Sequence, residues 1–366
     1  MKLFYPEIFE KFQCTGSKCK DNCCKTDWDI EIDDDTYSFY KNLDGGIGKK
    51  LVDCVSDEDG CHYLSRKDGR CPLLNDKGLC SLQFEYGEDK ISDICREHPR
   101  FYEWFGNYKE AGVGLACEEA VRLLLSDDRP IKFFTKDIDE EPDDLEYDTI
   151  VFDPLLRVRG LLIDLLQGSG LTLREKLSAV LCTAGAIQYA LDSDDYEKIK
   201  DVIKELSDPV GILAAVAYAD ISSASPNEAA KNILEYLKEL DYMESALPQK
   251  IAEAESFAEN TSPKSAEGGE RGEYEKLAVY FIYRYFLKCA RDFDVMSKVK
   301  TMIVIIFTAR IINLSRGAEQ SDRFDTVKEI CKEIEYSADN MCKLSEDSYT
   351  DNIFYDENLI ALLGWL

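Results

Sequence analysis

The chain has 366 residues, enough for two ordinary domains that each bury a hydrophobic core without disulfides or metals to hold it together. Its hydrophobic share of 45% and charged share of 32% are those of a globular protein, which argues against intrinsic disorder. The formal net charge of -28 argues against nucleic-acid binding, because that binding depends on Lys and Arg neutralising phosphates. The acidic excess either attracts a lysine-rich partner or serves solubility alone.

The two ends of the chain carry no membrane or export feature. The N-terminus reads MKLFYPEIFEKFQ and has no apolar run before its first acid, Glu7, so it is not a signal peptide and we expect a cytoplasmic protein. The longest uncharged apolar run near the other end, residues 301–309, is far below the roughly 20 residues that cross a bilayer. No membrane span is predicted.

The first third mixes short elements. Residues 28–33, WDIEID, alternate apolar residues with acids, which predicts a half-buried strand, and a helix is predicted from Asp34. Residues 71–80 place the turn residues NDKG between two short apolar runs, which predicts a tight loop or hairpin with a cysteine on each side. The run LACEEAVRLLL predicts a helix that reaches about Ser126.

An acidic segment divides the chain. Residues 137–148 read DIDEEPDDLEYD, with eight acids and one proline, a composition that repels itself and packs poorly. We therefore expect a linker at 137–149, a cysteine-rich domain at 1–136 and a helical domain at 150–366 that is a candidate for binding substrate. The predicted fold is mainly α, with a small α+β cysteine-rich N-terminal domain and a helical C-terminal domain.

The second part of the chain has helical periodicity almost throughout. Ser225 is placed to cap a helix whose first residue is Pro226. Residues 259–272 form a polar segment between two helical blocks, typical of a loop.

Cysteine is concentrated near the N-terminus, where ten of the fourteen fall at or before Cys117. In a reducing cytoplasm, dense cysteines indicate metal or redox chemistry more than a disulfide framework. Close thiolates repel one another, so several in one loop make physical sense when a cation neutralises them. The candidate metal ligands are four cysteines with C-x4-C-x3-C-C spacing and four at wider spacings: Cys14, Cys19, Cys23, Cys24, Cys71, Cys80, Cys95 and Cys117.

A zinc ion and an iron-sulfur cluster can each be bound by four thiolates, so the cysteines alone do not distinguish between these two kinds of metal centre. The C-x2-C knuckles of ordinary zinc sites are missing, which favours an iron-sulfur cluster and keeps zinc as the alternative. Adjacent Cys23 and Cys24 would point to opposite sides of an extended chain, so one compact site requires a turn between them. Two sites, or one site plus packed thiols, remain open.

The other cysteines and the histidines carry weaker expectations. Cys54 and Cys61 are either additional metal ligands or residues with no part in metal binding. His62 and His98 are expected to be surface residues, and a catalytic role is the less favoured interpretation. Four later cysteines are predicted to pack in the core as small hydrophobes: Cys182, Cys289, Cys331 and Cys342.

The motifs FQCTGSKCKDNCCKTDWDIEID, CPLLNDKGLCSLQFEYGEDKISDICREHPR and GLACEEAVRLLL resemble the flagellin lysine-N-methylase family. The cysteine region of that family is similar to a wider group of zinc- or iron-chelating proteins. The resemblance covers roughly residues 5 to 125 and implies an enzyme that methylates lysine ε-amines in flagellin with S-adenosylmethionine and carries a 4Fe-4S cluster. The cluster candidates that it implies are the same eight cysteines.

The residues themselves show no familiar site for S-adenosylmethionine. Glycine-rich nucleotide loops and the doubly wound sheet of most methyltransferases are not recognisable in the sequence. One hypothesis is an iron with only three protein thiolates, whose open position takes the amino and carboxylate groups of S-adenosylmethionine. The radical-type spacing C-x3-C-x2-C is not met, because position 26 is Thr26.

Methylation requires a neutral lysine, whereas free lysine titrates near about 10.4, so an enzyme must strip a proton or desolvate the amine. The aromatic stripe HPRFYEWFGNY supplies the candidate pocket residues Tyr102, Trp104 and Tyr108, or it is core beside the metal site. The preferred hypothesis is a cluster-bearing protein-lysine methyltransferase. The alternatives are a non-enzymatic zinc- or iron-binding protein that recruits a partner through its helical domain and, ranked last, a redox sensor using Cys23 and Cys24.

Overall fold

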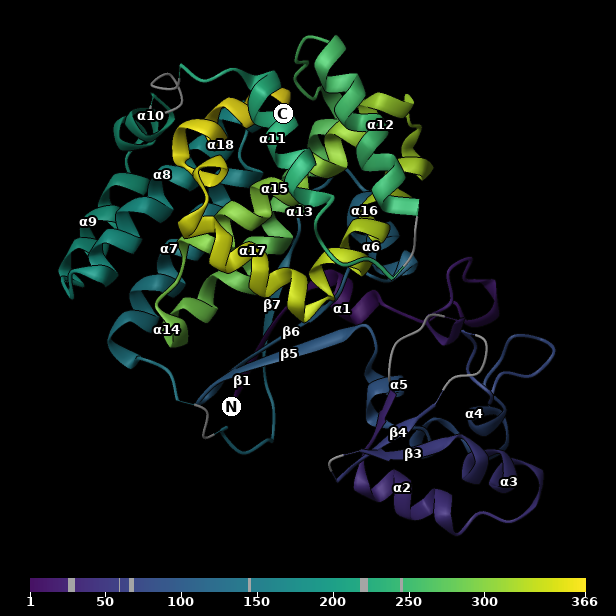
Figure 1. The fold of residues 1–366 in the computed structure, drawn as a ribbon. Coiled ribbons are helices and arrows are strands. Elements are labelled where there is room, and N and C mark those ends of the chain that lie inside the picture. The colour runs from purple at the N-terminus through teal and green to yellow at the C-terminus, as the bar shows by residue number, and fades with distance from the viewer. Residues whose placement is uncertain (26–29, 59, 66–68, 144–145, 218–222, 244–245) are drawn as a thin grey trace.

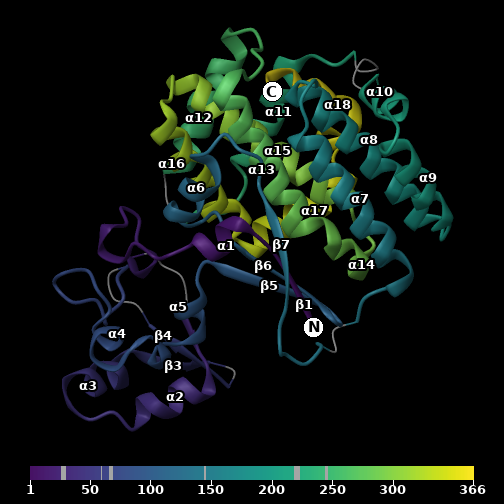
Figure 2. The same cartoon turned by 180° about the vertical axis from the view of Figure 1, so that it is seen from behind.

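The computed structural model describes residues 1–25, 30–58, 60–65, 69–143, 146–217, 223–243 and 246–366. Both views show a large helical body and a smaller lobe (Figure 1 and Figure 2). Most of the N-terminal cysteines belong to the lobe. A four-stranded sheet lies along the edge of the body and extends toward the lobe.

The four-stranded sheet has the order β5-β6-β1-β7. Strand β1 (Lys2–Pro6) pairs parallel with β6 (Tyr108–Val113) and antiparallel with β7 (Phe133–Asp137), and β5 (Arg100–Phe105) pairs antiparallel with β6. Tyr283 of the body donates its hydroxyl to the carbonyls of β1 and β6, at 3.0 and 2.8 Å. The sheet is thereby fixed to the helices.

The lobe contains a three-stranded antiparallel sheet, β2-β4-β3, formed by Ile30–Ile32, Cys61–Leu64 and Val55–Glu58 in that order. Its helices are α2 (Asp34–Lys41), α3 (Gly45–Cys54), α4 (Ser81–Tyr86) and α5 (Asp93–Glu97). Strand β2 confirms the predicted strand for its described part, whereas Trp28 lies outside the described residues.

The lobe has a small hydrophobic core of its own, which runs from Ile32 to Ile91 and includes Cys71. The helix predicted from Asp34 is confirmed: the Asp33 side chain caps it by accepting a hydrogen bond from the Thr36 N–H.

The body holds the helices that follow the acidic segment. They are α7 (Thr149–Gln167), α8 (Leu173–Asp192), α9 (Glu197–Leu206), α10 (Pro209–Ala217), α11 (Pro226–Leu237), α12 (Ala246–Asn260), α13 (Gly268–Tyr285), α14 (Cys289–Asp292), α15 (Met296–Arg316), α16 (Gln320–Ile330), α17 (Ala338–Thr350) and α18 (Asp356–Leu362). The apolar run 301–309 lies within α15, which is buried on all sides at the centre of the body. Within the described part of the chain, no helix has the length and apolar character needed to span a membrane.

The hydrophobic core of the body includes residues on both sides of the acidic segment. Ile8 of α1 (Glu7–Lys11), Phe105 of β5 and Val121 of α6 (Glu118–Leu125) belong to the same core cluster as the helices after residue 149. Asp148, the last acid of the predicted linker, caps α7 by accepting a hydrogen bond from the Ile150 N–H at 2.7 Å. The part of the first 136 residues that stands apart from this core is the lobe.

The loop predicted at 259–272 is shorter in the structure, since α12 ends at Asn260 and α13 begins at Gly268. Two other sequence predictions are confirmed. Helix α6 ends next to Ser126, and α11 begins at Pro226 with the Ser225 hydroxyl accepting from the Glu228 N–H. The reason is local: each depends on a cap, a proline or an amphipathic stripe that needs no distant partner.

Candidate functional site

All eight candidate cysteines line one cavity of about 480 Å³, at the junction of the lobe and the body. Phe12, Cys117 and Lys332 form the wall on the body side, and Leu73 and Leu82 belong to the core of the lobe. Residues more than 300 positions apart in sequence thus face the same space.

The loop 14–24 reaches this cavity through two short turns. Gly16, with φ of +56°, begins the first turn, Gly16–Lys18, and its N–H donates to the Cys14 sulfur at 3.4 Å. The second turn, Cys23–Lys25, is a 3-10 turn whose Cys24 N–H donates to Asn22 Oδ1 at 2.8 Å. This turn is the feature that lets adjacent Cys23 and Cys24 both line one cavity.

The predicted turn between Cys71 and Cys80 is confirmed. Asn75 Oδ1 accepts from the N–H groups of Lys77 and Leu79, and Leu74 forms a β-bridge with Cys80. The Cys71 N–H donates to the Cys24 carbonyl at 2.9 Å, which joins this turn to the first cysteine loop. Cys95 comes from α5 and Cys117 from the residue that precedes α6.

The thiols fall into two neighbourhoods. Burial raises the pKa of Cys95 to about 12, with further contributions from three nearby thiols. These four form the lobe set: Cys24, Cys71, Cys80 and Cys95.

The second neighbourhood adjoins the body. Burial raises the pKa of Cys19 to about 12, with Glu118 and Cys117 adding to the effect, and burial and Cys14 raise that of Cys117. We call Cys14, Cys19 and Cys117 the body set, and Cys23 lines the same cavity. The raised pKa values of Cys19, Cys80, Cys95 and Cys117 keep these four thiols protonated near neutral pH, so a metal that binds them must displace protons.

No group of three or more His, Cys, Asp or Glu among the described residues is arranged to hold a single metal ion. The eight sulfurs line the walls of a cavity instead of converging on one point. Thiolates are the usual ligands of zinc and of iron-sulfur clusters, and a cluster binds each thiolate to a different metal atom.

Comparison with known protein families gives a match for most of the helical body. Residues 159–362 match the family described as the FliB lysine N-methylase C-terminal domain. The chain belongs to the FliB lysine N-methylase C-terminal domain family. It is 30% identical over 129 residues to the lysine-N-methylase of Salmonella typhimurium, a match that covers 33% of this chain and 32% of the relative.

The same identity over 129 residues relates the chain to the flagellar biosynthetic protein FliU of Salmonella muenchen, where it covers 76% of the relative. The chain spans about a third of the length of the lysine-N-methylases that it matches. No solved structure matches it significantly.

The FliB domain contributes a wall to the cavity through a π-helical segment, Cys331–Glu335, in which every residue is buried. Lys332 of this segment lines the cavity and is 2% exposed. Its Nζ lies 3.2 Å from Asp21 Oδ2, and Lys328 reaches the same oxygen at 2.9 Å. These ion pairs fasten the first cysteine loop to the FliB domain, and π-helical turns are frequent at functional sites.

A buried polar network lies behind this wall. Glu335 Oε1 accepts from Tyr280 and Tyr285 at 2.6 and 2.9 Å and lies 2.8 Å from Arg284 Nη1. The neighbouring Tyr336 ring packs edge-on against His98, which lines the cavity, with ring centroids 6.2 Å apart. Burial lowers the pKa of His98 to about 4, so this imidazole is neutral at physiological pH.

The three aromatic candidates do not form one pocket. The register of the β5–β6 hairpin places Tyr102 and Trp104 on one face of the sheet and Tyr108 on the other. The residues that line the thiol cavity include the first three of this stripe, His98, Pro99 and Arg100, but none of the three aromatic candidates. Whether the aromatic residues act in catalysis stays a prediction.

Tyr102 and Trp104 flank a lysine of this chain, Lys109. The Lys109 ammonium lies 4.8 Å from the Tyr102 ring centroid and 4.7 Å from that of Trp104, and it pairs with Glu140. On the opposite face, Tyr108 contacts Glu110 and Arg159, a buried ion pair.

The remaining cysteines and His62 lie away from the cavity walls. Cys54 and Cys61 are half-buried at the ends of α3 and β4, and His62 stacks on Tyr37 with centroids 3.4 Å apart. Of the four later cysteines, Cys289 and Cys331 are buried as predicted, and Cys182 is half-buried. The prediction for Cys342 is wrong, because it lies on the exposed side of α17.

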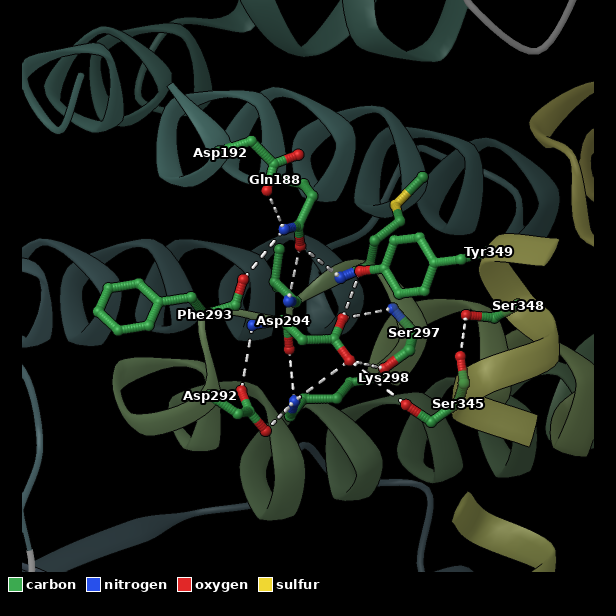
Figure 3. A network of polar contacts seen from close by, with 12 residues as sticks. Gln188, Asp192, Asp292, Phe293, Asp294, Ser297, Lys298, Ser345, Ser348 and Tyr349 are labelled. Atoms are coloured by element: carbon green, nitrogen blue, oxygen red, sulfur yellow. Dashed lines mark hydrogen bonds and ion pairs between the residues drawn. The ribbon is translucent and has the colours of Figure 1, made fainter. Parts of the chain in front are cut away.

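A second, smaller cavity of about 150 Å³ lies in the body where α13, α15 and α17 meet. Figure 3 shows the polar network beside it, centred on Asp294. Asp294 accepts hydrogen bonds from the Ser297 N–H at 3.0 Å and the Tyr349 hydroxyl at 2.6 Å, and Lys298 pairs with Asp292 at 2.7 Å. These contacts cap α15 and join it to α17, which accounts for the network as a structural hub.

Proposed function

We propose that this chain is a protein-lysine N-methyltransferase whose substrate is flagellin or a similar lysine-bearing protein. The observation that carries the proposal is the match of residues 159–362 to the FliB lysine N-methylase C-terminal domain, the same domain that supplies Lys332 to the thiol cavity. The names of the relatives, lysine-N-methylase and flagellar biosynthetic protein, support the reaction and the substrate.

The donor set supports a cysteine-ligated metal centre in the cavity. Eight thiols line a cavity of about 480 Å³, which provides the ligands and the space that a polynuclear cluster requires. Among the described residues, no three His, Cys, Asp or Glu side chains are arranged around one point, as a single zinc ion would require. We propose the lobe set, Cys24, Cys71, Cys80 and Cys95, as the ligands of a 4Fe-4S cluster. The body set would hold a second centre or complete the first.

The residues around the cavity would control its charge and its water. The cavity wall carries both signs of charge: Lys332, Arg96 and Arg100 line it together with Asp21 and Glu88, and Lys332 and Arg96 are paired with Asp21 and Asp93. The core residues Leu73 and Leu82 exclude water on the lobe side. A low local dielectric strengthens every electrostatic interaction inside the cavity.

The substrate lysine must lose its proton before methylation. S-adenosylmethionine would supply the methyl group: its methyl–sulfur bond breaks as the new N–C bond forms, the sulfur keeps the electron pair, and the nitrogen has already given its proton to a base or to water. A carboxylate raises the pKa of a nearby ammonium and keeps it charged. Acidic side chains would therefore capture the substrate, and a neutral group such as His98 is better suited to the reacting end.

The experiment combines metal analysis with an assay. The chain is purified without oxygen, its iron and acid-labile sulfide are measured, and methylation of flagellin lysines is followed by mass spectrometry. Cys71→Ser should reduce iron and sulfide content and methyl transfer together, whereas Cys182→Ser, at a half-buried thiol away from the cavity walls, should leave both unchanged.

Three results would contradict the proposal in different ways. Zinc without iron or sulfide in oxygen-free protein, together with no methyl transfer, would favour a non-enzymatic metal-binding protein. Methyl transfer that survives Cys71→Ser would separate the reaction from the thiol cavity. A spectrum of the reduced protein that S-adenosylmethionine leaves unchanged would contradict binding at an open iron position.

A further inference from the structure

Helix α10, residues Pro209–Ala217, reads PVGILAAVA and carries no charged side chain. A helix that is apolar on all sides is normally buried in a core. None of the residues of α10 is buried, and Val210 and Leu213 are 71% and 60% exposed. The helix lies at the edge of the body, beside α8 and α9 and far from the cysteine lobe (Figure 1 and Figure 2).

The exposed residues of α10 form a continuous stripe. Val210, Leu213, Ala214 and Ala217 are all exposed and follow the i, i+3, i+4, i+7 spacing of one helix face, which extends about 13 Å for a helix of this length. The other side packs on α8 and α9. We call these four residues the outward stripe.

The packing of α10 fixes the direction of the stripe. Gly211 lies so close to the end of α9 that a Cβ there would come 2.3 Å from the Glu205 carbonyl oxygen. The Asp208 carboxylate accepts a hydrogen bond from the Val210 N–H at 3.1 Å and caps the helix. The outward stripe therefore faces solvent because of backbone contacts on its inner side.

The border of the stripe is acidic. Residues 192–208, which lead into α10, contain seven carboxylates and three lysines. The lysines form i, i+3 ion pairs within α9 and the turn before it: Lys198 with Asp195, Lys200 with Glu197 and Lys204 with Asp201. A partner that approaches the stripe consequently meets a surface of net negative charge.

We propose that the outward stripe is a docking site for a lysine-bearing amphipathic helix of the protein substrate. Amphipathic helices bind apolar surfaces through anchors at i, i+3, i+4 and i+7, the spacing that the stripe itself presents. The acidic border attracts basic flanks and disfavours acidic segments. The inference rests on the proposed function, and it places substrate capture in the FliB domain at a distance from the thiol cavity.

The test compares Leu213→Glu with Ile150→Glu, because Ile150 is 68% exposed at the start of α7 and undergoes the same change of charge on another surface. KM and kcat are measured with flagellin from the organism that makes this chain and with a short unstructured lysine peptide. Leu213→Glu should raise KM for flagellin about tenfold, since one aliphatic anchor contributes on that scale. Its kcat, its activity on the peptide and its unfolding temperature should match those of Ile150→Glu.

Added salt gives a second measurement. Raising the ionic strength should raise KM for flagellin in the wild type, because screening weakens the attraction between the acidic border and a basic helix. The same change should leave the activity on a neutral, unstructured peptide nearly constant.

The outcomes separate docking from catalysis. If the wild type methylates flagellin and both variants do so equally well, docking at α10 is refuted and the proposed function stands. If no protein is methylated but fluorescence anisotropy shows flagellin binding that Leu213→Glu weakens, docking stands and the proposed function fails. A dimer that Leu213→Glu dissociates, or binding of phosphatidylcholine and phosphatidylglycerol vesicles through the stripe, with an unchanged KM for flagellin, would overturn the proposal.

Discussion

Replacing Gly114 by alanine should show how tightly the FliB domain is packed against the cavity wall. Gly114 follows β6, and its N–H donates to the Pro99 carbonyl at 2.8 Å. A Cβ at this position would lie 1.7 Å from the Tyr336 hydroxyl oxygen, 2.7 Å from the Tyr336 Cζ and 3.0 Å from Arg284 Nη1. None of these atoms can stay where it is.

The cost follows from these distances. Ordinary contacts of a Cβ begin near 3.4 Å, so the Tyr336 hydroxyl must move by about 2 Å, and overpacking of this kind costs about 1–3 kcal/mol. Tyr336 has little room to move, since its ring packs against His98 with centroids 6.2 Å apart and lies 5.1 Å from the Arg284 guanidinium, which Glu335 holds at 2.8 Å. For a domain of this size, the unfolding temperature should fall by about 2–4 °C for each kcal/mol.

Thermal unfolding followed by circular dichroism measures the effect. Gly160→Ala is the matched control: Gly160 lies inside α7 with no atom within 4 Å of the added Cβ, so alanine there should stabilise the protein by about 0.5–1 kcal/mol. Tyr336→Phe removes the closest atom but leaves the ring, so it should rescue Gly114→Ala only in part. If Gly114→Ala unfolds at or above the wild-type temperature while Gly160→Ala behaves as expected, the packing described here is not rigid.

Two further changes test buried groups. Glu110→Gln leaves Arg159, 1% exposed and 2.8 Å from Glu110 Oε2, without its charged partner, and should lower the free energy of unfolding in denaturant by about 3–5 kcal/mol. Adding Arg159→Met should recover much of this loss, because no buried charge is then left unpaired. An unchanged unfolding midpoint for Glu110→Gln alone would refute the role of the pair. The pKa of His98 is about 4 in the folded protein and 6.5 in the unfolded chain. The stabilisation that comes from keeping this imidazole neutral is therefore fully present above about pH 6.5 and is lost as the pH falls toward 4. The difference in unfolding free energy between wild type and His98→Asn should shrink by up to about 3 kcal/mol between pH 7 and pH 4, and a constant difference would contradict the depressed pKa.

Local chemistry explains what the sequence could predict. The Asn75 turn, the Ser225 cap and the helix ending near Ser126 depend on neighbouring residues, and all three are present. The eight cysteines singled out by their density line one cavity, whereas metal binding by them stays a prediction, because no three of the described ligand residues are arranged around a single ion. The turn at Cys23 and Cys24 answers the question that adjacent cysteines raised.

Other features had a weaker signal or none. Gly106 and Asn107 form a two-residue hairpin loop, and this dipeptide is a turn signal in the sequence. Counting alternate residues from that loop along each strand would have placed Trp104 and Tyr108 on opposite faces of the sheet. The placement of Lys332 had no local signal, because its contact with Asp21 joins residues 311 positions apart through a buried π-helical turn. Cys342 was misplaced because helical spacing alone does not tell which side of α17 meets the body.

The parallel pairing of β1 with β6 has a consequence for biosynthesis. Residues 2–4 pair with 108–110, and β7 at 133–137 joins only afterwards, so β1 is synthesised more than a hundred residues before the strands that flank it. The intervening lobe, with its separate core, can fold during that delay. The thiols of the lobe are therefore present on a folded unit before the body supplies the opposite wall of the cavity.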